Sequence, residues 1–224
     1  MRRKLAIVAA VGPGMGLAIA KRFAREGFDL ALVGRSLVQG ASLVSEIEAL
    51  GATARVYAAD LTDVFSIEAA FADIRAAQGP CDVMVYNGGV WNEGPPLAMP
   101  PEDFHRDLAL CVTGAYACAR AVHAEMKGTG GGVILFTGGG LALAPEYGVN
   151  VASLVAGKTG LRGLGLALHE GLKADNIHVG MVTIAGTVAR GGAFDPDRIA
   201  DSYWTLYSEP RSAWTAEIVF SGAS

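Results

Sequence analysis

Glycine fills every second position of one short stretch near the N-terminus, Val11-Gly12-Pro13-Gly14-Met15-Gly16. An apolar run precedes this stretch and a segment with helical spacing follows it, which is typical of a turn between a strand and a helix. Glycines in such a turn let the backbone approach a pyrophosphate, while the free N–H groups of the helix N-terminus attract its charge. We predict a dinucleotide site at Gly12, Gly14, Met15 and Gly16. A tight turn that binds nothing is the alternative.

A second feature lies about 20 residues further on, where an NAD-binding chain places an acidic residue for the ribose hydroxyls. Here the second apolar run ends in Gly34-Arg35-Ser36. An arginine can pair with a 2′-phosphate through its planar guanidinium, so Arg35, with Ser36 beside it, favours NADP(H) over NAD(H). A solvated loop charge is the alternative for Arg35.

Two later apolar runs also end in residues suited to a cofactor. Ala59-Asp60-Leu61 follows the third run, and the Asp60 carboxylate can accept a hydrogen bond from an adenine amino group. Capping of the next helix is the alternative, although Asp63 can already do that. The fourth run is followed by Tyr86-Asn87-Gly88-Gly89, a second glycine turn that we expect at the same edge of the sheet.

The segments that must position these residues alternate between two patterns. Strand-length apolar runs lie at 5–10, 29–34, 53–58, 82–86, 132–137 and 177–184. Segments with helical spacing lie at 14–26, 37–50, 63–78, 103–127, 149–174 and 195–219, the last in two pieces that separate near Pro210. Runs that are apolar throughout fit strands buried on both faces, and their alternation with helices implies right-handed crossovers. We predict a doubly wound parallel α/β sheet in a single domain over residues 1–224.

Composition narrows the range of functions. The chain has 224 residues, of which 51% are apolar, enough for one domain with its own core. The net charge of −4, with scattered Lys and Arg, argues against a nucleic-acid partner, so we expect a small-molecule substrate. The three cysteines and four histidines show no disulfide or metal-site spacing, and we predict no metal.

The N-terminus imitates a secretory signal, because Met1-Arg2-Arg3-Lys4 precedes an apolar run. Pro13 and the glycines interrupt that run, and no uninterrupted apolar stretch of ~18 residues exists, so we predict no membrane span. We expect a cytoplasmic protein.

Together the motifs resemble those of the short-chain dehydrogenase/reductase family, in order and spacing, over about residues 4–190. The resemblance is carried by the glycine turn, VGRS, AADL, YNGG and Lys158 in a helix after the fifth strand. The family pattern T-G-x-x-x-G-x-G is kept at its last two glycines, whereas Ala9 and Ala10 replace the first Thr and Gly. The resemblance implies a Rossmann fold, an NADP(H)-dependent oxidoreductase, and a homo-oligomer, dimer or tetramer, formed through helices around 103–127 and 149–174. It also implies that Asn87 and Gly89 support the central strand edge and the cofactor.

The resemblance implies a catalytic set of which this chain keeps one member. In the family a Tyr four residues before the Lys exchanges a proton with a carbonyl or alcohol, and the Lys lowers the pKa of that Tyr and holds the nicotinamide ribose. Lys158 matches, but Leu154 replaces the Tyr, and Val151 excludes the longer spacing of enoyl reductases. Glycine replaces the Ser in the run Phe136-Thr137-Gly138-Gly139-Gly140, and Cys111 replaces the Asn.

Two hydroxyl groups are candidates to replace the missing acid. Thr137 is the nearest hydroxyl, and Tyr147 lies eleven residues ahead of Lys158 in a loop that should flank the pocket. Packing or a lid contact is the alternative for Tyr147. Lys158 can act as a cofactor clamp alone, with a solvated helix charge as its alternative. After the sixth strand, Gly186 and Thr187 can present backbone and hydroxyl groups to the carboxamide.

The remainder, 190–224, resembles the family's substrate-covering helical segment. Its aromatic residues at helical spacing favour core or interface contacts over substrate contacts; they are Tyr203, Trp204, Tyr207 and Trp214. No segment after Phe220 is long enough for the usual seventh strand, so we expect six to seven strands with the C-terminal one missing. The favoured function is a divergent NADP(H)-binding oxidoreductase. The alternatives are a catalytically silent sensor or subunit of a larger assembly and, less favoured, a scaffold that binds nothing.

Overall fold

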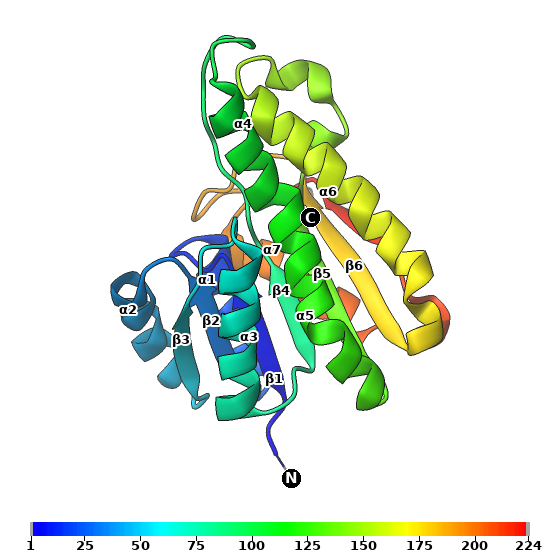
Figure 1. Cartoon of the computed structure of the whole chain (residues 1–224). Helices are drawn as coiled ribbons and strands as arrows, with labels where there is room; N and C mark the ends of the chain where they lie inside the picture. The colour runs from blue at the N-terminus through cyan, green and yellow to red at the C-terminus, as the bar shows by residue number, and fades with distance from the viewer. Residues whose placement is uncertain (1, 223–224) are drawn as a thin grey trace.

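The computed structural model describes residues 2–222 and shows one central sheet with helices on both faces (Figure 1). The strands are β1 (Leu5–Ala9), β2 (Asp29–Gly34), β3 (Ala54–Ala58), β4 (Val83–Tyr86), β5 (Gly132–Gly139), β6 (Ile177–Ile184) and β7 (Glu217–Phe220). All seven are parallel and lie in the order β3-β2-β1-β4-β5-β6-β7. The predicted doubly wound parallel sheet is therefore confirmed.

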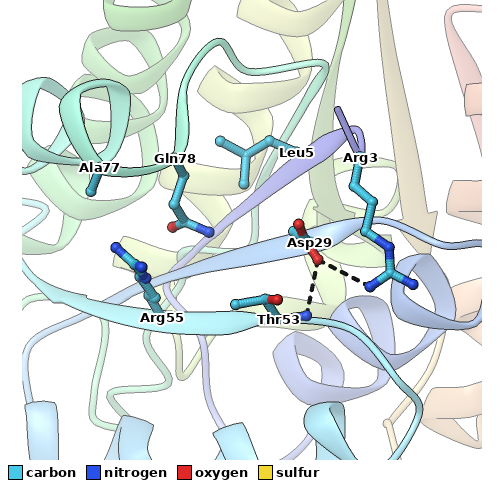
Figure 2. Close-up of a pocket in the computed structure, with 7 residues that line it drawn as sticks. All are labelled: Arg3, Leu5, Asp29, Thr53, Arg55, Ala77 and Gln78. Carbon is cyan, nitrogen blue, oxygen red and sulfur yellow. Dashed lines mark hydrogen bonds and ion pairs between the residues drawn. The ribbon is translucent and has the colours of Figure 1, made fainter. Parts of the chain in front are cut away.

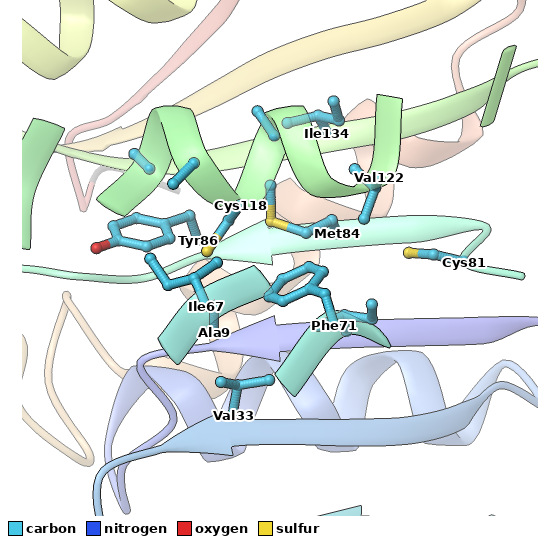
Figure 3. Packing of buried hydrophobic residues seen from close by; sticks show 14 of the residues in the cluster. Ala9, Val33, Ile67, Phe71, Cys81, Met84, Tyr86, Cys118, Val122 and Ile134 are labelled. Atoms are coloured by element: carbon cyan, nitrogen blue, oxygen red, sulfur yellow. The ribbon is translucent and has the colours of Figure 1, made fainter. Parts of the chain in front are cut away.

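The helices form two layers. One face of the sheet is covered by α1 (Met15–Arg25), α2 (Leu37–Glu48) and α7 (Pro196–Ser208). The other is covered by α3 (Val64–Gln78), α5 (Gly114–Gly128) and α6 (Ala152–Gly171), with the short α4 (Pro101–Leu108) rising beyond the sheet edge (Figure 1). Strand side chains alternate between the layers. Ile7 and Met84 thus pack under α3 and α5, whereas Val8 and Val85 face α1 and α7. Figure 3 shows Ile67 and Phe71 of α3 beside Met84 of β4.

The C-terminal aromatic residues belong to the core, as their spacing favoured. Tyr203 is fully buried, and Trp204 and Tyr207 make edge contacts with Phe23 of α1. Trp214 stacks on His178 with ring centres 4.9 Å apart. The three cysteines are also buried and free.

The expected absence of a C-terminal strand is wrong. β7 pairs with β6 from Met181–Glu217 to Ile184–Phe220, within the segment that the sequence assigned to a second helical piece. The helix α7 ends at Ser208 because Pro210 follows closely, and Ile218 and Val219 are β-branched residues that suit a strand. The sequence does not indicate this strand, because its apolar run covers only residues 218–220 and adjoins a segment with helical spacing.

The segment 190–224 is therefore only partly helical. Its helix α7 lies against α1, on the same face of the sheet. Residues 1 and 223–224 of the expected domain lie outside the described residues. The predicted helix 103–127 is likewise interrupted, by a π-helical turn at Ala109–Thr113 that joins α4 to α5. Within residues 2–222, no helix has the length and apolar character needed to cross a membrane.

Candidate active site

The glycine turn between β1 and α1 leaves open space beside its backbone. A Cβ added to Gly12 or Gly14 would meet no atom within 4 Å, whereas one added to Gly16 would lie 2.9 Å from the Val11 Cα. Gly16 is therefore required for packing, and the other two glycines are not. The helix α1 begins at Met15 without a side-chain cap or an acidic residue in its first turn. An uncapped helix N-terminus beside open space fits a pyrophosphate.

Ala10 adopts an unusual backbone conformation at the start of this turn. Its φ is 61°, in the left-handed region that favours glycine. Hydrogen bonds fix it on both sides, because the Val11 amide donates to Val33 O at 3.0 Å and the Asn87 side chain donates to Ala10 O at 3.3 Å. Ala10 thus adopts a conformation that favours glycine, at the position where the family pattern has a glycine.

At the ends of β2 and β3, the predicted adenosine-side residues lie at the surface. Arg35 is exposed, and the Ser36 hydroxyl caps α2 by accepting from the Gln39 amide at 3.2 Å. The Asp60 carboxylate accepts from the Thr62 hydroxyl and amide at 2.7 and 2.9 Å, and these bonds, with a smaller effect of Arg35, lower its pKa.

Asp60 does not cap the next helix, since Asp63 does so by accepting from the Phe65 amide. The capping alternative for Asp60 is therefore wrong. Leu61 is 4% exposed, so its side chain belongs to the core and its backbone alone is available to a ligand.

Lys158 is buried beneath the second glycine turn. It is 8% exposed, and its Nζ donates to the carbonyls of Gly88 and Thr137 at 2.9 and 2.8 Å. A Cβ added to Gly89 would lie 3.1 Å from that Nζ. Burial lowers the pKa of Lys158, while two carbonyl acceptors support its charged form. A solvated helix charge is therefore excluded, and the ammonium lies directly beside the turn.

The neighbourhood of Lys158 is apolar where a proton donor would be needed. Leu154 Cδ1 lies 4.0 Å from where a Cβ on Gly89 would be. Cys111 is fully buried and packs on Gly157. A Cβ added to Gly139 would lie 3.3 Å from the Lys158 Cγ, whereas a side chain at Gly138 would overlap the Thr183 hydroxyl, which donates to Glu217 at 2.6 Å. No motif marks the contact between Gly138 and Thr183, because the two residues meet only across paired strands.

The two candidate replacement hydroxyls do not meet Lys158. The Thr137 Oγ1 lies 2.7 Å from the Tyr203 hydroxyl on the α7 side, and only the Thr137 carbonyl faces Lys158. Tyr147 lies in a 3₁₀ turn, Pro145–Gly148, with 81% of its surface exposed. Thr137 contacts the lysine through its backbone alone, and Tyr147 projects into solvent.

The segment after β6 crosses the glycine turn. Arg190 Nη2 donates to Pro13 O at 3.1 Å, and the Phe194 ring occupies the space beside Gly186. Thr187 is exposed on the same segment. The sequence predicts roles for Gly186 and Thr187 but none for Arg190, which no motif marks.

The family that the sequence resembles has N-N-A-G where this chain has Tyr86-Asn87-Gly88-Gly89, and the two departures, Tyr86 and Gly88, are coupled. Tyr86 is fully buried, and its hydroxyl donates to Leu110 O in the π-helical turn. Its ring fills the space that a side chain at Gly88 would need, and its hydroxyl lies 2.6 Å from where a Cβ on Gly114 would be. Glycine at both positions therefore accommodates the large residue that replaces the first Asn.

A separate hollow of about 230 Å³ lies at the opposite edge of the sheet, where β1, β2 and β3 begin (Figure 2). It is lined by Arg3, Leu5, Asp29, Thr53, Arg55, Ala77 and Gln78. The Asp29 carboxylate already has partners there, since it accepts from the Thr53 amide and pairs with Arg3. The predicted site residues lie at the other edge, so this hollow does not belong to their site.

Comparisons with known proteins agree with this geometry. A family model described as short chain dehydrogenase matches residues 4–192. A solved metagenomic short-chain oxidoreductase in complex with NADP is 30% identical, with a TM-score of 0.86 over 96% of this chain and 95% of that one. A short-chain dehydrogenase from Rhodopseudomonas palustris is 29% identical, with a TM-score of 0.85 over 97% of each chain. The 3alpha-hydroxysteroid dehydrogenase of Mediterraneibacter gnavus is 26% identical over 98% of this chain and 95% of its own length.

Proposed function

The chain belongs to the short-chain dehydrogenase family, and on that premise we propose that it binds NADP(H) and catalyses hydride transfer without the family's tyrosine acid. The observation that carries this proposal is Lys158, buried beneath the Gly88–Gly89 turn with Leu154 one helical turn before it. The lysine is arranged to hold a ligand hydroxyl, and the leucine cannot donate a proton.

Each half of the cofactor has candidate partners among the described residues. The N–H groups around Gly14 and Met15 would hold the pyrophosphate, and Asp60 would accept from the adenine amino group. Lys158 would hold the nicotinamide ribose, and Gly186 and Thr187 would face the carboxamide. When bound, the nicotinamide supplies the hydride donor or acceptor.

The absence of the family's tyrosine acid determines the rate of hydride transfer that we expect. A positioned general acid contributes about 10²–10⁴-fold, so binding and orientation alone leave a slow reaction. Of the two candidate hydroxyls, Tyr147 is free to approach a bound substrate, whereas Thr137 would have to leave Tyr203. We therefore propose that Tyr147 or water exchanges the proton with the substrate.

Titration with NADPH and NADH tests the cofactor and its preference. Arg35 is exposed and has no hydrogen-bond partner among the described residues, which supports its pairing with a 2′-phosphate, so NADPH should bind more tightly. The Arg35→Asp variant should lose that preference, and Arg198→Asp, an exposed control on α7, should keep it. Equal affinities in the wild-type protein would exclude the NADP(H) assignment, and no saturable binding would indicate a scaffold.

A panel of carbonyls and alcohols, followed at the nicotinamide absorbance band, tests the reaction. We expect slow turnover that Lys158→Ala abolishes, and faster turnover when Leu154→Tyr restores the hydroxyl. NADPH binding without turnover in either protein would favour the alternative, a silent sensor or subunit of a larger assembly.

We also propose that the chain forms a homo-oligomer through α5 and α6. A hollow of about 170 Å³ lies on this outer face, lined by Tyr116, Ala119, Arg120, His123, Leu168 and Leu172. Tyr116 is half exposed, and such an apolar surface is suited to a second copy. Sedimentation should show a dimer or tetramer that Tyr116→Glu weakens, and a monomeric wild-type protein would contradict this.

A further inference from the structure

Asp107 is a buried carboxylate that forms no ion pair with any side chain of residues 2–222. It is 6% exposed and lies on α4, one helical turn before Cys111. A buried charge without a counter-charge destabilises a protein unless hydrogen bonds compensate it. Here Ser153 Oγ donates to Oδ2 at 2.7 Å, and Asn92 Nδ2 lies 2.9 and 3.1 Å from the two carboxylate oxygens.

The two partners come from different elements. Ser153 is 1% exposed in the first turn of α6, and Asn92 lies in the loop between β4 and α4, residues 87–100. Close by, the Gly94 amide donates to Asn150 O at 2.9 Å, just before α6. This loop is thus attached at two neighbouring points: Asn92 is joined through Asp107 to Ser153 of α6, the helix that carries Lys158, and Gly94 is joined to the chain just before that helix.

The rest of the loop makes few packing contacts that would hold it. Trp91 and Leu97 are 62% and 97% exposed. Segments with few buried apolar contacts open at low free energy, so the polar attachments near Asn92 decide where this loop lies. Near its start, Gly88 and Gly89 lie against the Lys158 ammonium.

We propose that Asp107 is a positioning residue: with Asn92 and Ser153 it holds the loop 87–100 against α6, and so keeps the Gly88–Gly89 turn in place over Lys158. The effect on the cofactor rests on the proposed function, whereas the effect on the loop does not. Asp107 itself has no place in the proton transfer.

Hydrogen exchange of the loop amides tests the proposal directly. Breaking a hydrogen bond to a charged group should speed exchange at residues 89–94 by about tenfold, so Asn92→Ala and Ser153→Ala should both show this. Asn92→Asp should do the same by placing two carboxylates together. The double variant Asn92→Asp, Asp107→Asn restores one donor facing one carboxylate, and its exchange should return toward the wild-type rate.

The matched control is Asp103→Asn on the same helix, because the Asp103 side chain pairs with Arg106 and makes no hydrogen bond to Asn92, Asp107 or Ser153. It should leave the exchange unchanged. Ser153→Ala removes a single hydroxyl and serves as the mild variant if the others fold poorly. Unchanged exchange in Asn92→Ala and Ser153→Ala, or no recovery in the double variant, would overturn the proposal.

NADPH affinity provides the second readout. The variants that loosen the loop should weaken NADPH binding by about tenfold, and the double variant should recover it. Faster exchange with unchanged affinity would overturn the role in positioning. Turnover lost in Asp107→Asn and not recovered in the double variant, with affinity intact, would identify Asp107 as a proton donor instead. Wild-type protein that binds no NADPH would refute the proposed function, and the exchange data would still decide whether Asp107 fixes the loop.

Discussion

The two halves of the candidate site differ in what occupies the space around their backbone. Around the glycine turn of β1 and α1, the positions Gly12 and Gly14 face open space. Around the end of β5 and the start of α6, the corresponding space is filled, by Leu154 beside Gly89 and by Thr183 beside Gly138. The first half leaves open space beside its backbone, whereas the second is filled by packed side chains. Under the proposed function, cofactor binding and proton transfer are separable in this fold, and Lys158 lies at their boundary.

Removal of the Lys158 ammonium should produce the largest effect. Lys158→Met keeps most of the apolar volume but removes the donor, and hydrogen bonds of a charged group contribute about 1.5–3 kcal/mol. We expect NADPH affinity to fall about 10- to 100-fold in a calorimetric titration. Lys127→Met, on the exposed end of α5, is the control. Unchanged affinity would show that Lys158 contributes to packing and does not bind the cofactor.

A matched pair of glycine substitutions should separate ligand space from packing. In Gly16→Ala the new methyl group meets the Val11 backbone, so we expect a loss of about 1–3 kcal/mol in the free energy of unfolding. In Gly14→Ala, where φ is −92°, the fold should keep its stability while NADPH binding weakens. Thermal unfolding with and without NADPH measures both. The comparison fails if Gly14→Ala destabilises the apo protein as much as Gly16→Ala does.

Acid should affect the side of the sheet formed by β6 and β7, where His178 lies at the start of β6, more than the glycine turn. His178 is fully buried, its Nε2 lies 2.9 Å from Thr215 O, and its Nδ1 has no partner within the described part of the chain. Burial lowers the pKa of His178, with His169 adding in the same direction and the Thr215 carbonyl and Glu209 opposing it.

Because the unfolded chain binds this proton more readily than the folded one, stability is present above about pH 6.5 and is lost as the pH falls toward the lowered folded pKa. We expect a loss of about 1 kcal/mol between pH 7 and 5.5 in urea unfolding. His178→Gln should flatten this slope, and His105→Gln, an exposed control on α4, should not. Hydrogen exchange at pH 5.5 should accelerate around β7 first, and equal acceleration at the glycine turn would contradict the comparison.

The smallest effect concerns Ala10 in the open half. A left-handed conformation costs an alanine about 1–2 kcal/mol, and glycine avoids this cost but loses more backbone entropy on folding. Ala10→Gly should therefore raise the free energy of unfolding by less than about 1 kcal/mol, seen as a small rise in Tm. A lower Tm would show that the methyl group contributes packing that exceeds the strain.

Sequence reasoning found the parts of the molecule that depend on local pattern. The strands β1 to β6 and the glycine turn follow clear local patterns, and the replacement of the family's Tyr by Leu154 is inferred from one fixed spacing. The sequence does not indicate β7, in which only residues 218–220 form an apolar run, or the contact between Gly138 and Thr183, which only strand pairing creates. The cluster around Asp107 also escaped, because Asn92, Asp107 and Ser153 are distant in sequence and share no motif. Patterns within one element are visible in a sequence, whereas contacts between elements need the fold.

The buried Tyr86 also limits the order in which this chain can have changed. A side chain at Gly88 or Gly114 overlaps its ring or hydroxyl, so Tyr86 is compatible with the fold only when both neighbours are already glycine. The reverse path is closed in the same way at Gly88, since alanine there is tolerated only after the tyrosine has gone, whereas at Gly114 the Leu61 carbonyl excludes a side chain in any case. Substitutions at positions 86 and 88 therefore have effects whose sign depends on each other, and the family's ordinary N-N-A-G turn is separated from this one by ordered steps.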